Sequence, residues 1–542
     1  MAVVLLIQAA RNARPRSIFR FCGYRLISIG AKPLATLVTR LERIASALLL
    51  GQFRINRGRA LPARIQRSKA GMSHLIEKTA IETITLLQKG EITPLDCLDA
   101  LESRIGAVEK AVNALPILCF ERARAAARTV MARPKEARGL LAGLPVAIKD
   151  LNEVRGVRTT HGSPIFANFV PEKSDPLVER LEDEGGVIYA KSNTPEFGAG
   201  ANTFNEVFGA TLNPWNTALS AAGSSGGAAV ALATGTAWLA HGSDLGGSLR
   251  NPASFNAIVG MRPSPGRVAT EAGPPIDRQL GVQGPMARNV EDCALFLDAL
   301  SGEDIRDPVS LPRPQTSFLD AARSGWKPKR IAFSADLGIT PVDSEVAEIC
   351  RRAALRFAEA GTIVEEAHPD FSEAHDTFNV LRARNFAISK KALLEKKRDL
   401  LKPEVIWNIE KGLALTMEDI TRAETQRAAL YRRSLAFFET YDLLLTPATI
   451  VPPYPVEQRY VESCNGIAFD NYVHWLAIAY AITLVSCPAI SIPCGFTKAG
   501  LPVGLQIVAR PRADARALAG AKAMEDILAL GRITPIDPRP AR

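Results

Sequence analysis

The chain has 542 residues, of which 47% are hydrophobic, so it is long enough for one large domain or two ordinary ones with a substantial core. This composition excludes a disordered or fibrous protein. The formal net charge of +10 arises in the first 71 residues, which hold fourteen Lys and Arg and a single acid. The remaining chain, with 52 basic and 55 acidic residues, lacks the strongly basic body expected of a nucleic-acid-binding protein.

Residues 1–71 form a basic N-terminal extension that has three interpretations. Their Arg-rich, acid-poor composition suits an organellar transit peptide, and it also suits a basic arm on a membrane surface. The third interpretation is that the native chain starts at Met72, because an amphipathic helical pattern begins directly after it, over residues 73–87. We favour the third and rank a nucleic-acid-binding arm lowest, since no matching fold or aromatic stacking platform follows.

Cap residues and apolar runs place helices and strands alternately along the chain. Thr93 and Pro94 are an N-cap and a first-turn proline, so a helix should start there and run towards Val108. A second helix should start at Asp175–Pro176 and end at Gly185–Gly186, directly before a buried strand. The same alternation predicts a strand at 329–334, a helix at 344–360, a strand at 362–365, a charged helical segment at 377–440, and strands at 442–445 and 488–494. Helices that alternate with buried strands predict an α/β fold.

Beyond residue 72 the chain shows neither an interdomain linker nor an internal repeat. We therefore predict one domain over residues 72–532, followed by a C-terminal tail at 533–542.

Cysteine usage and apolar stretches bear on the compartment. The eight cysteines include no Cys-x-x-Cys pair, which argues against a zinc site or a disulfide framework and favours a reducing compartment, the cytoplasm. Two uncharged stretches, 216–243 and 475–496, are interrupted by Gly and Ser or by Pro. They suit buried core segments better than membrane spans, so we expect no span.

Three segments concentrate residues that could carry chemistry: Gly143–Asp150, Gly223–Gly227 and Gly242–Arg250. Glycine lets a backbone approach a ligand closely and exposes N–H groups. Each segment alone is a weak signal, because Ser-Ser-Gly-Gly is a common loop composition and a lysine after a strand is more often a surface residue. Neither Gly-rich segment has the spacing of a phosphate-binding loop, which disfavours a nucleotide site.

Together, in order and spacing, the three segments resemble the amidase signature family. The resemblance is strong over 143–290 and 441–510, and weak over 1–71 and 302–440. The family usually shows Pro-Gly before Gly-Ser-Ser-Gly-Gly and Ser after it, where this chain has Ala221, Ala222 and Ala228. The matching segments also include residues 159–163, 190–198, 251–268, 444–448, 488–493 and 500–508.

The resemblance implies an α/β/α sandwich with a mixed central β-sheet covered by helices, and neither a metal nor an organic cofactor. It makes Lys149 the base, Ser224 a bridging serine in a cis peptide, and Ser248 the nucleophile that is acylated. It also assigns supporting roles: an oxyanion hole at Leu245, Gly246 and Gly247, bracing by Ser225, Asp244 and Arg250, and a substrate-binding backbone at Gly198, Ala199 and Gly200.

The chemistry of the residues agrees with these roles. A serine hydroxyl is a poor nucleophile until a neighbour takes its proton, and a lysine with its ordinary pKa of about 10.4 is charged at pH 7. Lys149 must therefore be buried, and the apolar run Val146–Ile148 before it supplies burial. His241 and Lys191 are competing bases; a core role suits His241 better, and Lys191 matches a family segment beside the site.

The sequence therefore predicts a serine hydrolase that cleaves the C–N bond of a small-molecule amide, with anilides, carbamates and esters open to the same acyl-enzyme route. One alternative is the glutaminase subunit of a tRNA-dependent amidotransferase, although residues 271–283 lack that subunit's usual pattern. Another is a catalytically inactive binding scaffold, against which the intact Lys149, Ser224 and Ser248 argue. No nucleic-acid partner is expected, and a homodimer is left open.

The sequence does not identify the substrate. Its recognition should depend on residues 302–440 and 456–478, where the resemblance is thin. The aromatic residues of these regions could shape a pocket or belong to the ordinary core: Trp407, Tyr460, Tyr472 and Trp475. Stereochemical preference and oligomeric state also stay open.

Overall fold

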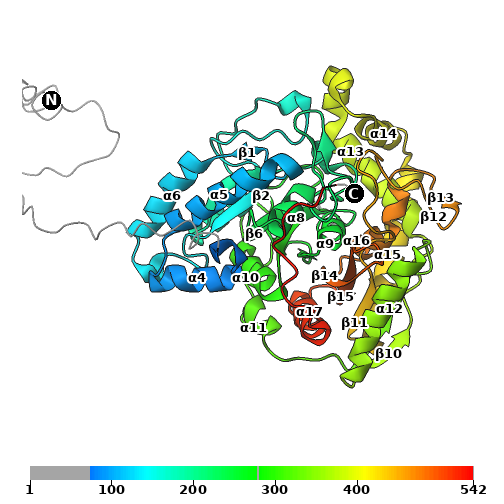
Figure 1. Cartoon of the computed structure of the whole chain (residues 1–542). Coiled ribbons are helices and arrows are strands. Elements are labelled where there is room, and N and C mark those ends of the chain that lie inside the picture. The colour runs from blue at the N-terminus through cyan, green and yellow to red at the C-terminus, as the bar shows by residue number, and fades with distance from the viewer. Residues whose placement is uncertain (1–73, 277–279, 541–542) are drawn as a thin grey trace, which may run out of the picture. The chain divides into compact units, whose positions relative to one another are not determined.

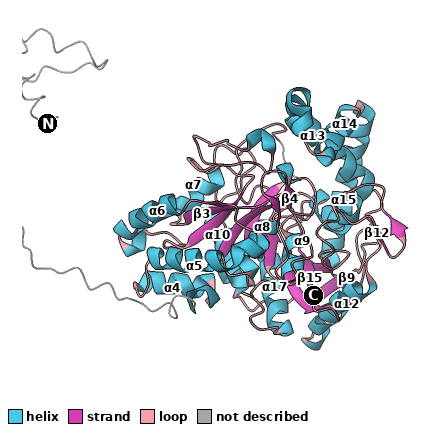
Figure 2. Cartoon of the chain, turned by 45° about the horizontal axis from the view of Figure 1, so that its top comes forward, coloured by secondary structure: helices cyan, strands magenta, loops and turns pink. Residues whose placement is uncertain are grey.

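The computed structural model describes residues 74–276 and 280–540. A mixed sheet of eleven strands runs through this part of the chain in the order β1-β3-β2-β6-β8-β7-β14-β15-β11-β9-β10 (Figures 1 and 2). Its strands are β1 (Ile117–Leu118), β2 (Pro145–Lys149), β3 (Val187–Ser192), β6 (Leu239–Asp244), β7 (Val259–Arg262), β8 (Val282–Ala287), β9 (Arg330–Phe333), β10 (Ile363–Glu366), β11 (Leu443–Pro447), β14 (Ala489–Phe496) and β15 (Pro502–Val508). Two small hairpins, β4 (Phe204–Asn205) with β5 (Gly209–Ala210) and β12 (Ser463–Cys464) with β13 (Ile467–Ala468), lie outside it.

The strands run parallel at two places in the sheet, β3-β2-β6 and β11-β9-β10, and the strands between them pair in antiparallel fashion. Every residue of β2 and β3 is buried, so both faces of the sheet are covered here. Because β2 and β6 are parallel neighbours, their carboxyl ends meet at one edge of the sheet. Lys149 and Asp244 therefore come to the same place.

Helices cover the sheet and form a separate cluster beside its C-terminal half (Figure 1). The helices are α4 (Ala80–Lys89), α5 (Pro94–Val112), α6 (Phe120–Ala132), α7 (Pro176–Asp183), α8 (Gly226–Ala233), α9 (Arg250–Asn256), α10 (Val290–Leu300), α11 (Phe318–Ala322), α12 (Ser344–Glu359), α13 (Ala374–Lys397), α14 (Pro403–Leu413), α15 (Met417–Thr440), α16 (Ala477–Leu484) and α17 (Asp514–Leu528). Helices α8 and α9 are buried throughout. The mixed α/β sandwich predicted from the sequence is confirmed.

The predicted helix starts agree with the structure where a capping residue and a first-turn proline next to each other in the sequence define them. Helix α5 begins at Pro94, and the Thr93 side chain and the Asp96 carboxylate accept each other's backbone N–H. Helix α7 begins at Pro176 and ends at Asp183, directly before β3.

The single helix expected over residues 73–87 is wrong. Helical residues 74–77 are followed by a break at residues 78–79, and α4 starts separately at Ala80 with Thr79 as its N-cap. The Arg288 side chain donates to the carbonyls of Ile76 and Lys78, while the Asp292 carboxylate accepts the N–H groups of Ala80 and Ile81. These contacts satisfy the backbone groups that the break exposes.

The C-terminal residues described by the structure pack against the domain. Ile536 donates its N–H to the carbonyl of Ala233, and Arg104 forms an ion pair with Asp537 at 2.6 Å. The domain boundary at 532 stays a prediction, and residues 1–71 lie outside the described chain. None of the helices described between residues 74 and 540 combines the length and apolar character needed to cross a membrane.

Candidate active site

A pocket of about 470 Å³ opens at the edge of the sheet where β2 and β6 end. Ser224, Ser243 and Ser248 line its side nearest to the sheet. Its other walls include the loop that follows β7 and α13, together with Leu151, Phe197 and Gly198. Within residues 74–276 and 280–540, no cluster of three or more His, Cys, Asp or Glu side chains could bind a metal ion.

The Lys149 side chain is completely buried beneath this pocket. Its Nζ lies 2.8 Å from Ser224 Oγ, 2.9 Å from Ser225 Oγ and 3.0 Å from Ser243 Oγ. Burial lowers the pKa of Lys149 to about 7, although the charge of Asp244 acts in the opposite direction. A lysine in this position is largely uncharged just above neutral pH and can accept a proton.

Ser224 lies between Lys149 and the pocket, two residues before α8. The Gly223–Ser224 peptide bond is cis, as the resemblance predicts. A Cβ at Gly198 would come within 3.3 Å of Ser224 Oγ, so a glycine there leaves room for the hydroxyl. Ala222, at a position where the family usually shows Gly, adopts a left-handed backbone with φ of 56°.

The loop between β6 and α9 carries Ser248. The N–H of Gly247 donates to Asp244 Oδ1 at 3.1 Å, whereas no described residue accepts the N–H groups of Leu245 and Gly246. Gly247 has φ of 103°, and a Cβ there would lie 2.7 Å from the Ala479 Cβ. Leu245 and Gly246 thus offer N–H groups next to Ser248, and Gly247 shapes the loop.

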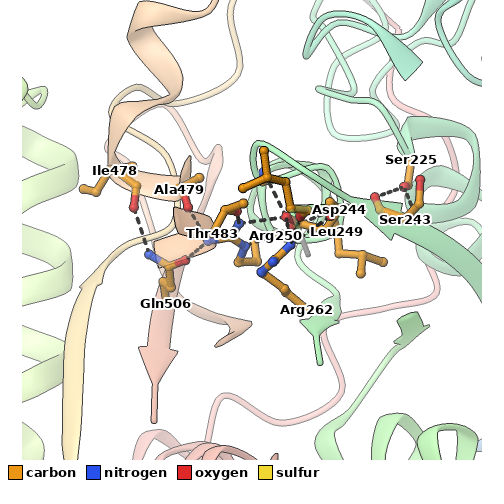
Figure 3. Close-up of polar contacts among 12 residues, drawn as sticks. Ser225, Ser243, Asp244, Leu249, Arg250, Arg262, Ile478, Ala479, Thr483 and Gln506 are labelled. Carbon is orange, nitrogen blue, oxygen red and sulfur yellow. Dashed lines mark hydrogen bonds and ion pairs between the residues drawn. The ribbon is translucent and has the colours of Figure 1, made fainter. Parts of the chain in front are cut away.

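A buried charge network holds this loop in place (Figure 3). Asp244 accepts Arg250 Nη2 at 2.8 Å and Arg250 Nε at 3.0 Å, and the Leu249 N–H at 3.1 Å. Burial alone would raise the pKa of Asp244, but the charges of Arg250 and Arg262 hold it well below its usual range. Arg250 also donates to the Ala479 carbonyl at 2.9 Å and to the Gln506 side chain, which ties the loop to α16 and β15.

Replacing Arg250 with Met is expected to lower the free energy of unfolding by about 3–5 kcal/mol, because Asp244 keeps a buried charge with one partner removed. Urea unfolding followed by circular dichroism would measure the loss. Arg330→Met is the matched control, since Arg330 forms an ion pair of 3.0 Å with Glu365 on the surface. The control should lose about 1 kcal/mol or less, and equal losses in the two variants would contradict a structural role for the buried network.

The competing bases occupy other environments. His241 is completely buried on β6, and burial lowers its pKa to about 3, so it stays uncharged in the core. Lys191 is also buried, but its Nζ lies 3.0 Å from Asp150 Oδ1 and 2.8 Å from both the Asn152 carbonyl and the Thr159 hydroxyl. Lys191 is therefore held in an ion pair, and of the three only Lys149 donates to the pocket residues Ser224 and Ser243.

The predicted substrate-binding backbone is only partly at the pocket. Gly198 lines the pocket, but Ala199 is completely buried with α14 residues and Gly200 is not part of the lining. The Ala199 carbonyl instead accepts a hydrogen bond from Lys402 Nζ. Of the three predicted residues only Gly198 lines the pocket, and the role of this backbone in substrate binding stays a prediction.

The pocket walls also differ from the expected aromatic residues. Trp407, Tyr460, Tyr472 and Trp475 do not line the pocket, and Tyr472 and Trp475 are buried core residues. The wall instead carries Phe197 and Phe386, with α13 supplying further residues from the region of thin resemblance: Arg382, Asn385, Ser389 and Lys390. Their spacing of three or four residues was a usable signal, because such positions share one helix face.

Known proteins resemble this chain over most of its length. A family model for amidases matches residues 96–518. An acylamidase of Rhodococcus erythropolis is 33% identical over 457 residues, covering 83% of this chain and 95% of that protein. A glutamyl-tRNA(Gln) amidotransferase subunit of Moorella thermoacetica is 35% identical over 473 residues, covering 82% of this chain and 96% of that protein.

Solved structures show the same similarity to amidases as the sequence comparisons. A bacterial aryl acylamidase of the amidase signature enzymes has a TM-score of 0.78 and 26% identity, and the match covers 85% of this chain and 99% of that chain. The chain therefore belongs to the amidase signature family and is an amide-hydrolysing enzyme.

Proposed function

We propose that the protein is a serine hydrolase that cleaves the C–N bond of small-molecule amides through an acyl-enzyme on Ser248. The observation that carries the proposal is the buried Lys149, whose Nζ is within hydrogen-bond distance of three hydroxyls and whose pKa is lowered to about 7. A base with a pKa near the working pH transfers protons most effectively. An acylamidase among the relatives supports this reaction class.

In the proposed first half-reaction, Ser248 Oγ attacks the substrate carbonyl and passes its proton to Ser224, which passes its own proton to uncharged Lys149. The N–H groups of Leu245 and Gly246 stabilise the oxyanion, because no described residue occupies them. The proton returns through Ser224 to the amide nitrogen, the C–N bond breaks and the amine leaves. Ser248 then carries the acyl group as an ester.

In the second half-reaction, water attacks the ester carbonyl and gives its proton through Ser224 to Lys149. The tetrahedral intermediate collapses, Ser248 Oγ regains a proton by the same route, and the carboxylic acid leaves. Lys149 finishes uncharged, as it began. The same sequence of steps accepts anilides, carbamates and esters, since each offers a carbonyl and a leaving group.

Intact-mass labelling with a fluorophosphonate tests the proposal. The protein should gain one adduct, and peptide mapping should place it on Ser248 and not on Ser224 or Ser243. Ser372→Ala, which changes an exposed serine outside the pocket, should label at the parent rate. No adduct, or an adduct on another serine, would overturn the proposed mechanism.

A second candidate is the glutaminase subunit of an amidotransferase, which rests on the 35% identity to an amidotransferase subunit. That function predicts that the purified chain alone hydrolyses glutamine and simple amides poorly. Robust turnover of simple amides by the purified chain would exclude it.

A further inference from the structure

One side of the pocket is a single face of α13. Phe378, Arg382, Phe386 and Lys390 follow each other at intervals of four residues, so they lie along the same side of the helix. A Cβ at Gly246 would come within 3.5 Å of Phe378 Cζ, which places this face against the loop that carries Ser248. Arg382 lies one helical turn, about 6 Å, further along, and it lines the pocket together with Ser248.

Arg382 is unusual among the buried arginines. Four arginine side chains are buried in residues 74–276 and 280–540. Three of them have a carboxylate partner: Arg250 and Arg262 pair with Asp244, and Arg267 pairs with Asp514. Arg382 is 6% exposed, yet it forms no ion pair with a described carboxylate.

The contacts of Arg382 hold it in place but supply no negative charge. Its Nη1 donates to Asn408 Oδ1, and its guanidinium lies 4.7 Å from the Phe386 ring centre and 5.3 Å from that of Tyr472. A guanidinium has five N–H donors, and its polar neighbours among the described residues, Asn408 and Tyr472, are both neutral. A buried charge is costly unless it is paired, so a partner is expected where the side chain meets the pocket.

The acidic groups around the pocket are engaged elsewhere or are exposed to solvent. Asp244 is neutralised by Arg250 and Arg262, and Asp307 accepts the N–H groups of Thr270 and Val309. Glu271, on the loop after β7, is exposed. Among the residues that the structure describes, no carboxylate is thus left to pair with Arg382, and a ligand in the pocket would supply the counter-ion.

From these contacts we infer that the substrate carries a carboxylate, which Arg382 binds on the α13 wall while Ser248 attacks the amide carbonyl. The planar guanidinium suits two parallel hydrogen bonds to a carboxylate. Phe386 and Leu245 line the same pocket, and such apolar side chains suit an apolar spacer between the two functional groups of the substrate. This inference names the substrate class of the proposed hydrolase and rests on that function.

Protection of Ser248 from fluorophosphonate labelling tests the inference without requiring turnover. One matched pair is glutaric acid monoanilide and the anilide in which isopropyl replaces its carboxylate. A second pair, para-acetamidobenzoate and para-isopropylacetanilide, places the charge on the amine side. In at least one pair the carboxylate compound should protect at a concentration about 10- to 100-fold lower, the range for a hydrogen bond to a charged group.

Arg382→Met should abolish that preference, with the protection of each variant expressed relative to its own labelling rate without a competitor. The variant is expected to fold, because removing an unpaired charge leaves no carboxylate stranded. Arg384→Met is the matched control, since Arg384 lies on α13 like Arg382 but pairs with Glu424 of α15 at 2.6 Å and does not line the pocket. It should keep the preference.

Equal protection within both pairs, or a preference that survives Arg382→Met, would overturn the inference and leave the proposed hydrolase intact. Failure of the parent to label at all would instead reject the proposed function.

Discussion

Replacing Ser248 with Ala is expected to lower kcat/KM for amide hydrolysis by about 10⁴- to 10⁶-fold, because the acyl-enzyme can no longer form. The Ser248 hydroxyl makes no hydrogen bond with the described residues, so its loss should leave the fold unchanged. The initial rate of amine release from an anilide measures the effect. The substrate KM should change little, because the oxyanion N–H groups and the pocket walls remain.

Thermal unfolding of Ser248→Ala serves as the control for that measurement. A parent-like Tm together with the lost rate assigns the effect to chemistry. A residual rate above about 1% of the parent, well over the expected remainder, would show that another residue is the nucleophile.

Replacing Lys149 with Met is expected to lower kcat/KM by about 10⁴-fold or more, because no base remains to take the proton from Ser224. In the parent, kcat/KM should rise with pH through about 7, since burial lowers the pKa of Lys149 and only the uncharged amine accepts a proton. Below pH 7 the rate should fall about tenfold per unit as Lys149 becomes protonated. The Met variant should lose this step.

Lys149→Arg separates the charge of this residue from its basicity. An arginine keeps a positive charge near the serines but does not give up its proton in a protein. The Arg variant should therefore be as inactive as the Met variant at every pH. Activity near the parent level in Lys149→Arg would mean that the charge matters and that Lys149 is not the base.

The parts of the fold that could be predicted are those fixed by neighbours in sequence. Thr93 and Asp96 cap α5 through contacts three residues apart, and the start of α7 at Pro176 is equally local. The break before α4 could not be predicted, because the groups that stabilise it are Arg288 and Asp292, about 210 residues later in the chain. These long-range hydrogen bonds thus stabilise a break in a segment whose sequence pattern is continuously helical.

The candidate site could also be predicted only in part, because its geometry depends on residues that are far apart in the sequence. Lys149 and Ser224 come together only through the parallel pairing of strands and the turn before α8, and no local signal encodes their distance of 2.8 Å. Their proximity was expected from the family resemblance, and the membership in that family is now shown. The catalytic roles of these residues remain a prediction.

The pocket wall was the least predictable part. The charges of α13 would ordinarily indicate a solvated surface, because lysines and arginines on a long helix usually face water. Arg382 and Phe386 instead face the pocket, whereas Trp475 and Tyr472, for which the sequence left a pocket role and a core role open, are core residues. Burial by helices distant in sequence decides which side chains are free for a ligand.

The hydrogen bonds that hold the Ser248 loop in place also have a consequence for synthesis of the chain on the ribosome. Arg250 depends on the Ala479 carbonyl and the Gln506 side chain, and β15 occupies the middle of the sheet between β14 and β11. A nascent chain whose residue 506 is still inside the ribosome therefore contains Ser248 and Lys149 but lacks the contacts that hold the Ser248 loop. The enzyme should gain activity only when translation is nearly complete. N-terminal fragments that end before residue 506 should not hydrolyse amides.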